Sequence, residues 1–173
     1  MSAIDDVLGK SSTADKAGDE SVSRWKGSGK IDLDALLEKQ REHHRSIQPV
    51  EVDVMLGEQP VKLFIPFVFP DEFSELADRH APRRSVAADI PLWFDLNGVT
   101  GAYPGITAMV DGDTDDLYRV RDQEAVYGWP DLYKALSPED QQNARMAVWA
   151  LHIWEPEQRR IAAFAKNEEA NRG

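Results

Sequence analysis

The sequence contains no cysteine among its 173 residues. Disulfide bonds and thiolate zinc sites are therefore excluded, and a reducing compartment is the expected location. No apolar run is long enough to cross a bilayer, and the N-terminus lacks the basic and apolar regions of a signal peptide. We therefore expect a cytoplasmic protein that does not associate with membranes.

Basic residues are too few to favour a nucleic-acid partner. The chain has 20 Lys and Arg against 31 Asp and Glu, which gives a formal net charge of -11 at pH 7. Such a charge repels phosphate backbones, and the sequence has no basic stripe. With 42% hydrophobic and 29% charged residues, the composition is that of one globular domain with a polar tail.

Signature motifs of the common enzyme classes are also missing. We find no nucleophile elbow, Walker loop, dinucleotide fingerprint or metalloprotease motif. The histidines form no recognisable pattern with a serine or a carboxylate: they are His43, His44, His80 and His152. His152 lies in the most apolar segment, where a core role is the main expectation. We predict a non-catalytic protein with no cofactor and no metal.

One acidic segment leaves an alternative open. DGDTDD at 111–116 resembles the start of a calcium loop, but Asp116 stands where an EF-hand needs glycine. The preferred interpretation is an acidic cap before a helix from Leu117 to Val126. The alternative is a calcium module or metal-dependent enzyme that uses this segment together with His152.

The N-terminal half begins with a polar stretch. Residues 1–30 are rich in Ser, Gly, Asp and Lys, and predict a flexible tail. A surface helix is expected from Ile31 to Ile47, capped by Asp32 or Asp34. Its apolar stripe is narrow and consists of Leu33, Leu36 and Leu37.

A β-hairpin follows and gives the clearest local pattern in the chain. Apolar residues alternate in VEVDVML at 50–56 and in QPVKLFI at 59–65, on either side of Gly57-Glu58. A two-residue turn with glycine first sets a register that places the valines of one strand opposite Val61, Leu63 and Ile65. Pro60 and Pro66 suggest that the second strand is an exposed edge. The apolar face needs a helix packed against it.

The middle of the chain is less regular. A short helix within 67–80 should start at Pro70-Asp71-Glu72 and bury Phe73, Leu76 and Ala77. VAADIPLWFDL at 86–96 is interpreted as containing a helix with Pro91 at or near its start, which buries Leu92, Trp93 and Leu96. The Gly- and Pro-rich NGVTGAYPG that follows predicts a loop or a broken helix end.

A helical cluster from Glu124 to Phe164 organises the C-terminal part. Ser137 and Pro138 form a strong helix start. In ARMAVWALHIW at 144–154, one apolar stripe includes the core candidates Ala147, Val148 and Leu151. A second includes the partner-binding candidates Met146, Trp149 and Ile153. A helix that is apolar on nearly every side needs cover on nearly every side, and the two assignments can be exchanged.

The predicted fold class is α+β, mostly α-helical with one N-terminal β-hairpin. We expect a flexible tail over 1–30, a single globular domain over 31–165 and a disordered C-terminus over 166–173.

The order of these features resembles the tail assembly chaperones of long-tailed bacteriophages, particularly those that infect actinobacteria. The resemblance spans residues 31–165, and it includes a W-x-x-L segment with Trp129, Leu132 and Leu136 before an apolar helix. It implies a non-catalytic protein that binds the tape measure protein and keeps it soluble while tail tube subunits polymerise. The other interpretation is a structural head–tail connector or minor tail protein, whose apolar helix is an interface in a homo-oligomer.

Overall fold

The computed structural model describes residues 29–173, and the chain divides into two compact units, Met1–Ile47 and Gln48–Gly173. Most of the predicted flexible tail, residues 1–28, lies outside the described part of the chain. The division after Ile47 differs from the expected single domain over 31–165, because the first helix belongs to the N-terminal unit.

The described part of the N-terminal unit contains helix α2 (Leu33–Ser46). Of the two predicted caps, Asp32 is the one that the structure uses, since its Oδ1 accepts a hydrogen bond of 3.0 Å from the backbone N–H of Ala35. No residue of α2 is buried, and its three leucines are all exposed. Among residues 29–47, nothing covers the narrow apolar stripe.

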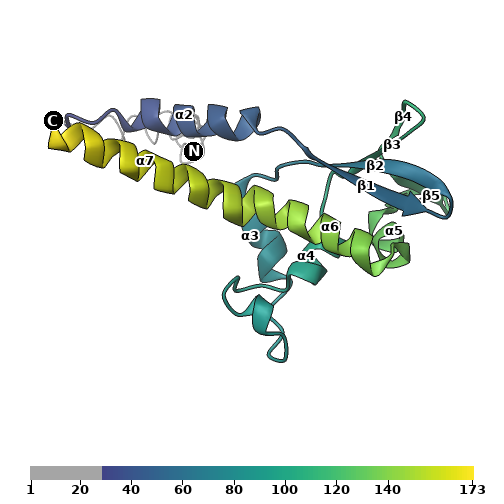
Figure 1. The fold of residues 1–173 in the computed structure, drawn as a ribbon. Helices are drawn as coiled ribbons and strands as arrows, with labels where there is room; N and C mark the ends of the chain where they lie inside the picture. The colour runs from purple at the N-terminus through teal and green to yellow at the C-terminus, as the bar shows by residue number, and fades with distance from the viewer. Residues whose placement is uncertain (1–28) are drawn as a thin grey trace, which may run out of the picture. The chain divides into compact units, whose positions relative to one another are not determined.

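The second unit has an α+β fold, as predicted, and combines helices with two antiparallel sheets (Figure 1). Four strands form a sheet in the order β1-β2-β3-β4, and two form the β5-β6 hairpin. The strands are β1 (Val50–Leu56), β2 (Gln59–Ile65), β3 (Thr107–Val110), β4 (Asp113–Asp115), β5 (Tyr118–Arg121) and β6 (Glu124–Tyr127). The single hairpin expected from the sequence is thus one half of a larger sheet.

The helical segments of this unit fall before and after the short strands. They are α3 (Pro70–Asp78), η1 (Ala87–Asp89), α4 (Leu96–Gly101), α5 (Trp129–Ala135), α6 (Pro138–Trp149), η2 (Ala150–Trp154) and α7 (Glu155–Arg172). The short helix predicted within 67–80 is confirmed as α3, with Leu76 buried. NGVTG lies within α4 and buries Val99 and Thr100, and the helix ends at Gly101, so the predicted broken helix end fits better than the predicted loop.

The predicted hairpin and its register are confirmed. Val54 pairs with Val61 and Val52 with Leu63, and Gly57 turns the chain with φ of +62°. Only glycine adopts such a backbone angle without steric cost, which is why it occupies the first turn position.

The prediction that β2 is an exposed edge was wrong, because β2 lies between β1 and β3. Pro60 pairs with Met55 of β1, but the pairing with β3 starts only at Lys62. Pro66 follows the last residue of the strand. Neither proline therefore removes a hydrogen bond that β3 requires, so the proline rule for edge strands does not apply here.

The remaining strands replace elements that the sequence analysis assigned differently. Asp111 and Gly112 have φ of +50° and +87° and form the two-residue turn between β3 and β4. The helix expected from Leu117 to Val126 was also wrong, since β5 and β6 occupy that range. Asp122 and Gln123, with φ of +50° and +68°, form their turn. Two successive left-handed residues match the twist of a hairpin and cannot occur inside an α-helix.

Helix α6 packs on β1 and β2 and covers the apolar face of the hairpin. Ser137 caps it, since its Oγ accepts a hydrogen bond of 3.1 Å from the N–H of Asp140. The stripe predicted as core is buried: Ala147, Val148 and Leu151 are each at most 4% exposed. Burial of Val148 and Leu151 contributes roughly 1.5–3 kcal/mol each.

Helix α7 follows α6 and η2 without a break, so that the three form one continuous rod (Figure 1). It reaches Arg172, whereas disorder was expected over 166–173. No residue of α7 is buried, although Ile161 and Phe164 are apolar. Growth from a helix that is already formed avoids the cost of nucleation, which explains order without burial.

Candidate functional site

The outward face of α6 forms one wall of a pocket of about 640 Å³, which we call the α6 groove. Gln142, Arg145, Met146 and Trp149 contribute this wall. Their spacing of three, one and three residues places them along one side of the helix. The face opposite the buried stripe is therefore lined by one aromatic and one thioether side chain beside polar groups.

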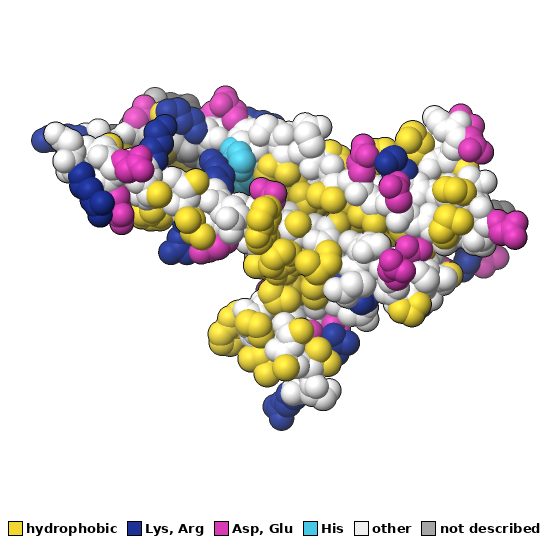
Figure 2. All heavy atoms as spheres, viewed as in Figure 1, with side chains coloured by type: hydrophobic (Ala, Val, Ile, Leu, Met, Phe, Trp, Pro, Cys, Tyr) yellow, Lys and Arg dark blue, Asp and Glu magenta, His cyan; other side chains and the backbone are white. Residues whose placement is uncertain are grey.

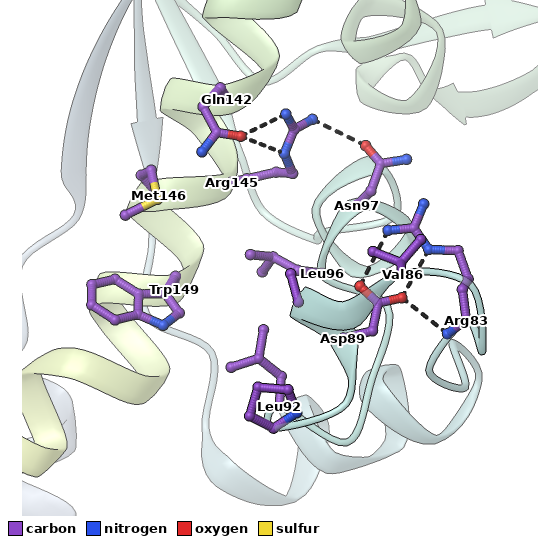
Figure 3. A pocket seen from close by; sticks show the side chains of 12 residues that line it. Arg83, Val86, Asp89, Leu92, Leu96, Asn97, Gln142, Arg145, Met146 and Trp149 are labelled. Carbon is purple, nitrogen blue, oxygen red and sulfur yellow. Dashed lines mark hydrogen bonds and ion pairs between the residues drawn. The ribbon is translucent and has the colours of Figure 1, made fainter.

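The second wall comes from the segment between α3 and α4, which faces α6 across the pocket (Figure 3). Its apolar lining residues are Val86, Ala88, Pro91, Leu92 and Leu96. In the space-filling view, hydrophobic side chains gather over this segment and the adjoining part of α6 (Figure 2). The groove is thus mainly apolar at the end where Trp149 faces Leu92.

An ion pair between a buried carboxylate and a partly exposed arginine holds this second wall in place. Asp89 is only 2% exposed, and its carboxylate accepts hydrogen bonds from Nε of Arg83 at 2.8 Å and from the backbone N–H of Arg83 at 2.9 Å. The guanidinium of Arg83 lowers the pKa of Asp89 and also contacts Asp95 at 3.0 Å. A buried carboxylate with these partners fixes the chain around η1.

No sequence pattern indicated this wall, and the helix predicted within 86–96, starting at or near Pro91, was wrong. Only the 3-10 turn η1 forms within that range before α4 begins at Leu96. Trp93, which was expected to be buried, is 83% exposed and has φ of +66°. A large residue in the left-handed region is strained, and such strain is found most often at functional sites. The hydrogen bonds from Trp93 N–H to the carbonyls of Asp89 and Ile90 hold it there.

At the other end of the groove, the guanidinium of Arg145 contacts neutral groups. Its Nη1 donates to Oδ1 of Asn97 at 3.2 Å and to the hydroxyl of Tyr133 at 3.0 Å, and its Nη2 donates to Oε1 of Gln142 at 2.6 Å. Within residues 29–173, Arg145 makes no ion pair, in contrast to Arg83. The dashed lines in Figure 3 mark the contacts of Arg145 with Gln142 and Asn97 and those of Arg83 with Asp89.

The three predicted partner-binding residues do not share one site. Met146 is 43% exposed, and both Met146 and Trp149 line the groove, but Ile153 does not. Ile153 lies in η2, which is π-helical. It lies about one turn beyond Trp149 along the helix axis, past the last α6 residue that lines the groove.

His152, in the same π-helical turn, is a half-buried residue with aromatic and hydroxyl partners. Its Nε2 lies 2.8 Å from the hydroxyl of Tyr103, and the rings of Phe67 and Phe73 both stack against it. Burial lowers the pKa of His152 to about 4. A neutral imidazole with a hydrogen-bond partner fits the core role that was expected of it.

The acidic segment 111–116 forms the β3–β4 turn and strand β4 rather than a cap for a helix. Oδ1 of Asp115 accepts hydrogen bonds from the N–H of Leu117 at 2.7 Å and from Arg119 at 3.1 Å. Among the described residues, no group of three or more His, Asp or Glu side chains is arranged to hold a metal ion. His152 contacts Tyr103, Phe67 and Phe73, whereas Asp115 contacts Leu117 and Arg119. The acidic segment and the histidine of the metal alternative therefore have no contact residue in common.

Two further observations bear on the whole described chain. None of the helices within residues 29–173 combines the length and apolar content needed to cross a membrane. Comparison with protein-family models, curated proteins and solved structures finds no match. The α6 groove is therefore interpreted from its own chemistry.

Proposed function

We propose that this chain is a non-catalytic phage tail assembly chaperone that holds an apolar helical segment of the tape measure protein in the α6 groove. The observation that carries this proposal is the pairing of Met146 and Trp149 with Leu92 and Leu96 across a pocket of about 640 Å³. These side chains offer apolar surface that the fold itself leaves partly uncovered.

A helix in a groove is a recurrent mode of peptide recognition, in which apolar anchors at helical spacing enter an apolar channel. Methionine adapts its shape to different anchors, and tryptophan is frequent at binding hot spots. Both are present on α6. The groove therefore suits a client with many related segments better than one small ligand of fixed shape.

The charge of the chain supports the same role. A chaperone for a long apolar client must remain dissolved while it carries exposed apolar surface, and a formal net charge of -11 favours solubility. The protein would act in the host cytoplasm, before and while tail tube subunits polymerise around the tape measure protein. This sequence of events follows from the resemblance to tail assembly chaperones.

Co-expression with a long helical tape measure protein encoded nearby tests the proposal. We expect the client to become soluble and to co-purify with the wild-type chain. Trp149→Glu should abolish capture and leave the thermal unfolding midpoint near the wild-type value. Trp154→Glu is the matched control, because Trp154 is 44% exposed but does not line the groove. An insoluble client, or equal capture by the Trp149 variant, contradicts the proposal.

A structural head–tail connector or minor tail protein is the second candidate. Apolar side chains are exposed away from the groove as well: Val120 on β5 is 78% exposed and Phe164 on α7 is 62% exposed. Such separate surfaces suit a subunit with several permanent neighbours. Light scattering coupled to size-exclusion chromatography tests this candidate, which requires a homo-oligomer whose mass does not change on dilution.

A further inference from the structure

The α6 groove joins an apolar end to a cationic end along one helix. Trp149 lies one helical turn from Arg145, so the two side chains start about 6 Å apart along the axis. Met146 lies between them on the same wall. Any helix that lies along α6 and places an apolar anchor against Trp149 therefore brings a side chain one turn away near Arg145.

Arg145 differs from the other arginine of the groove in its electrostatic surroundings. The carboxylates of Asp89 and Asp95 both contact Arg83, at 2.8 and 3.0 Å. Arg145 is half-buried and is oriented by three neutral oxygen atoms, those of Asn97, Tyr133 and Gln142. Neutral acceptors position a guanidinium without neutralising it, so its charge is available to a bound carboxylate.

We propose that the α6 groove selects client helices that carry Asp or Glu three or four positions from a large apolar anchor, with the carboxylate bound by Arg145. This inference rests on the proposed function, because it specifies which segments of the client the groove holds. A carboxylate fits better than a neutral amide because its hydrogen bond to the guanidinium is charge-assisted. A basic side chain at that position is rejected by like charge.

An array of overlapping client peptides tests this selection. Peptides of about 20 residues, long enough for several helical turns, cover the tape measure protein and are probed with the purified full chain. We expect the captured peptides to share an acidic residue one turn from Leu, Ile, Phe or Trp. Replacing that residue by Gln in a captured peptide should weaken binding about tenfold, as loss of a charged hydrogen bond does.

Reversal of charge provides the matched protein variants. Arg145→Glu should reduce binding of the acidic peptides and favour the same peptides with Lys at that position, whereas Arg145→Lys should retain the original preference. Thermal unfolding of each variant checks that the fold survives. The Glu-to-Gln peptides keep the test valid if Arg145→Glu does not fold, because they leave the protein unchanged.

The outcomes separate the two proposals. If capture depends on Trp149 but not on the charge of the peptide, the Arg145 inference fails and the chaperone proposal stands. If the client co-purifies but no short peptide is captured, the inference fails as well. In that case the groove does not recognise residues at helical spacing within a short segment. If the client neither co-purifies nor yields a captured peptide, the proposed function itself fails.

Discussion

The hydroxyl of Tyr103 lies 2.8 Å from Nε2 of His152, which links the end of α4 to the π-helical turn η2. The same hydroxyl donates to the carbonyl of Pro66 at 2.6 Å. Because a phenol has one proton, it must accept from His152, which places the imidazole proton on Nε2. Three distant segments of the chain therefore meet at one hydroxyl group.

Stability should fall as the pH drops from about 6.5 to about 4. Burial lowers the pKa of His152 from the ordinary 6.5 to about 4 in the folded protein, so in this window the unfolded chain binds the proton and the folded chain does not. The full difference corresponds to about 3 kcal/mol. His152→Gln retains a hydrogen-bond donor for Tyr103 but removes the pH-dependent contribution of the imidazole to the free energy of unfolding. Urea unfolding at several pH values should show the wild-type curve falling more steeply than that of the variant, and parallel curves would contradict the assignment.

Tyr103→Phe should lower the free energy of unfolding by about 1–3 kcal/mol. The substitution keeps the buried ring but leaves the Pro66 carbonyl and the His152 imidazole without their shared partner. Tyr118→Phe is the control, since Tyr118 is 51% exposed on β5, and a surface change of this kind alters stability by less than about 0.5 kcal/mol. Chemical denaturation of both variants measures the change in the free energy of unfolding. Equal effects would mean that the buried hydroxyl is not structurally important.

Asp140→Ala should destabilise the protein by about 1–2 kcal/mol and expose the edge of the four-stranded sheet. Oδ2 of Asp140 accepts a hydrogen bond of 3.0 Å from the N–H of Met55, on the side of β1 that faces no strand. An unpaired edge favours association between sheets. Asp140→Asn keeps an acceptor and should behave closer to wild type. Urea unfolding and light scattering at raised concentration measure the two effects, and unchanged behaviour of the alanine variant would exclude this role.

Trp93→Asn should raise the free energy of unfolding by up to about 1 kcal/mol, because Asn tolerates the left-handed region better than Trp. Trp93 is 83% exposed, so its replacement loses little buried surface. Ile90→Asn, at an exposed neighbour without a positive φ, should give no such gain. Thermal unfolding compares the two. A gain in stability together with weaker client capture would indicate that the strain is retained for binding.

The DGDTDD segment shows how a local signal was present in the sequence but assigned to the wrong structure. Asp-Gly is among the strongest short-range signals of a two-residue hairpin turn, and Asp111-Gly112 forms such a turn. The flanking strands β3 (TAMV) and β4 (DTD) are short, and β4 is entirely polar, so no alternation of apolar residues marks them as a pair. Asp122-Gln123 carries no glycine, and its left-handed pair is imposed by the pairing of β5 with β6.

The sequence by itself determined the elements whose information is local. Alternation around Gly57 set the register of the first hairpin, the caps at Asp32 and Ser137 set two helix starts, and the apolar period of α6 defined two stripes, of which the structure buries Ala147, Val148 and Leu151. These features depend on neighbours within a few residues, so a linear pattern contains them. The chaperone resemblance also comes from the sequence and stays a prediction.

Only the tertiary structure decided the composition of the groove. The wall opposite α6 is an irregular segment held by the Arg83–Asp89 ion pair, and no period in the sequence encodes its position. Ile153 of the predicted site does not line the groove, because the second wall ends opposite Trp149. In the same π-helical turn, His152 contacts Tyr103, Phe67 and Phe73. The position of the wall and the partners of His152 depend on residues far apart in the chain, and such contacts produce no local sequence pattern.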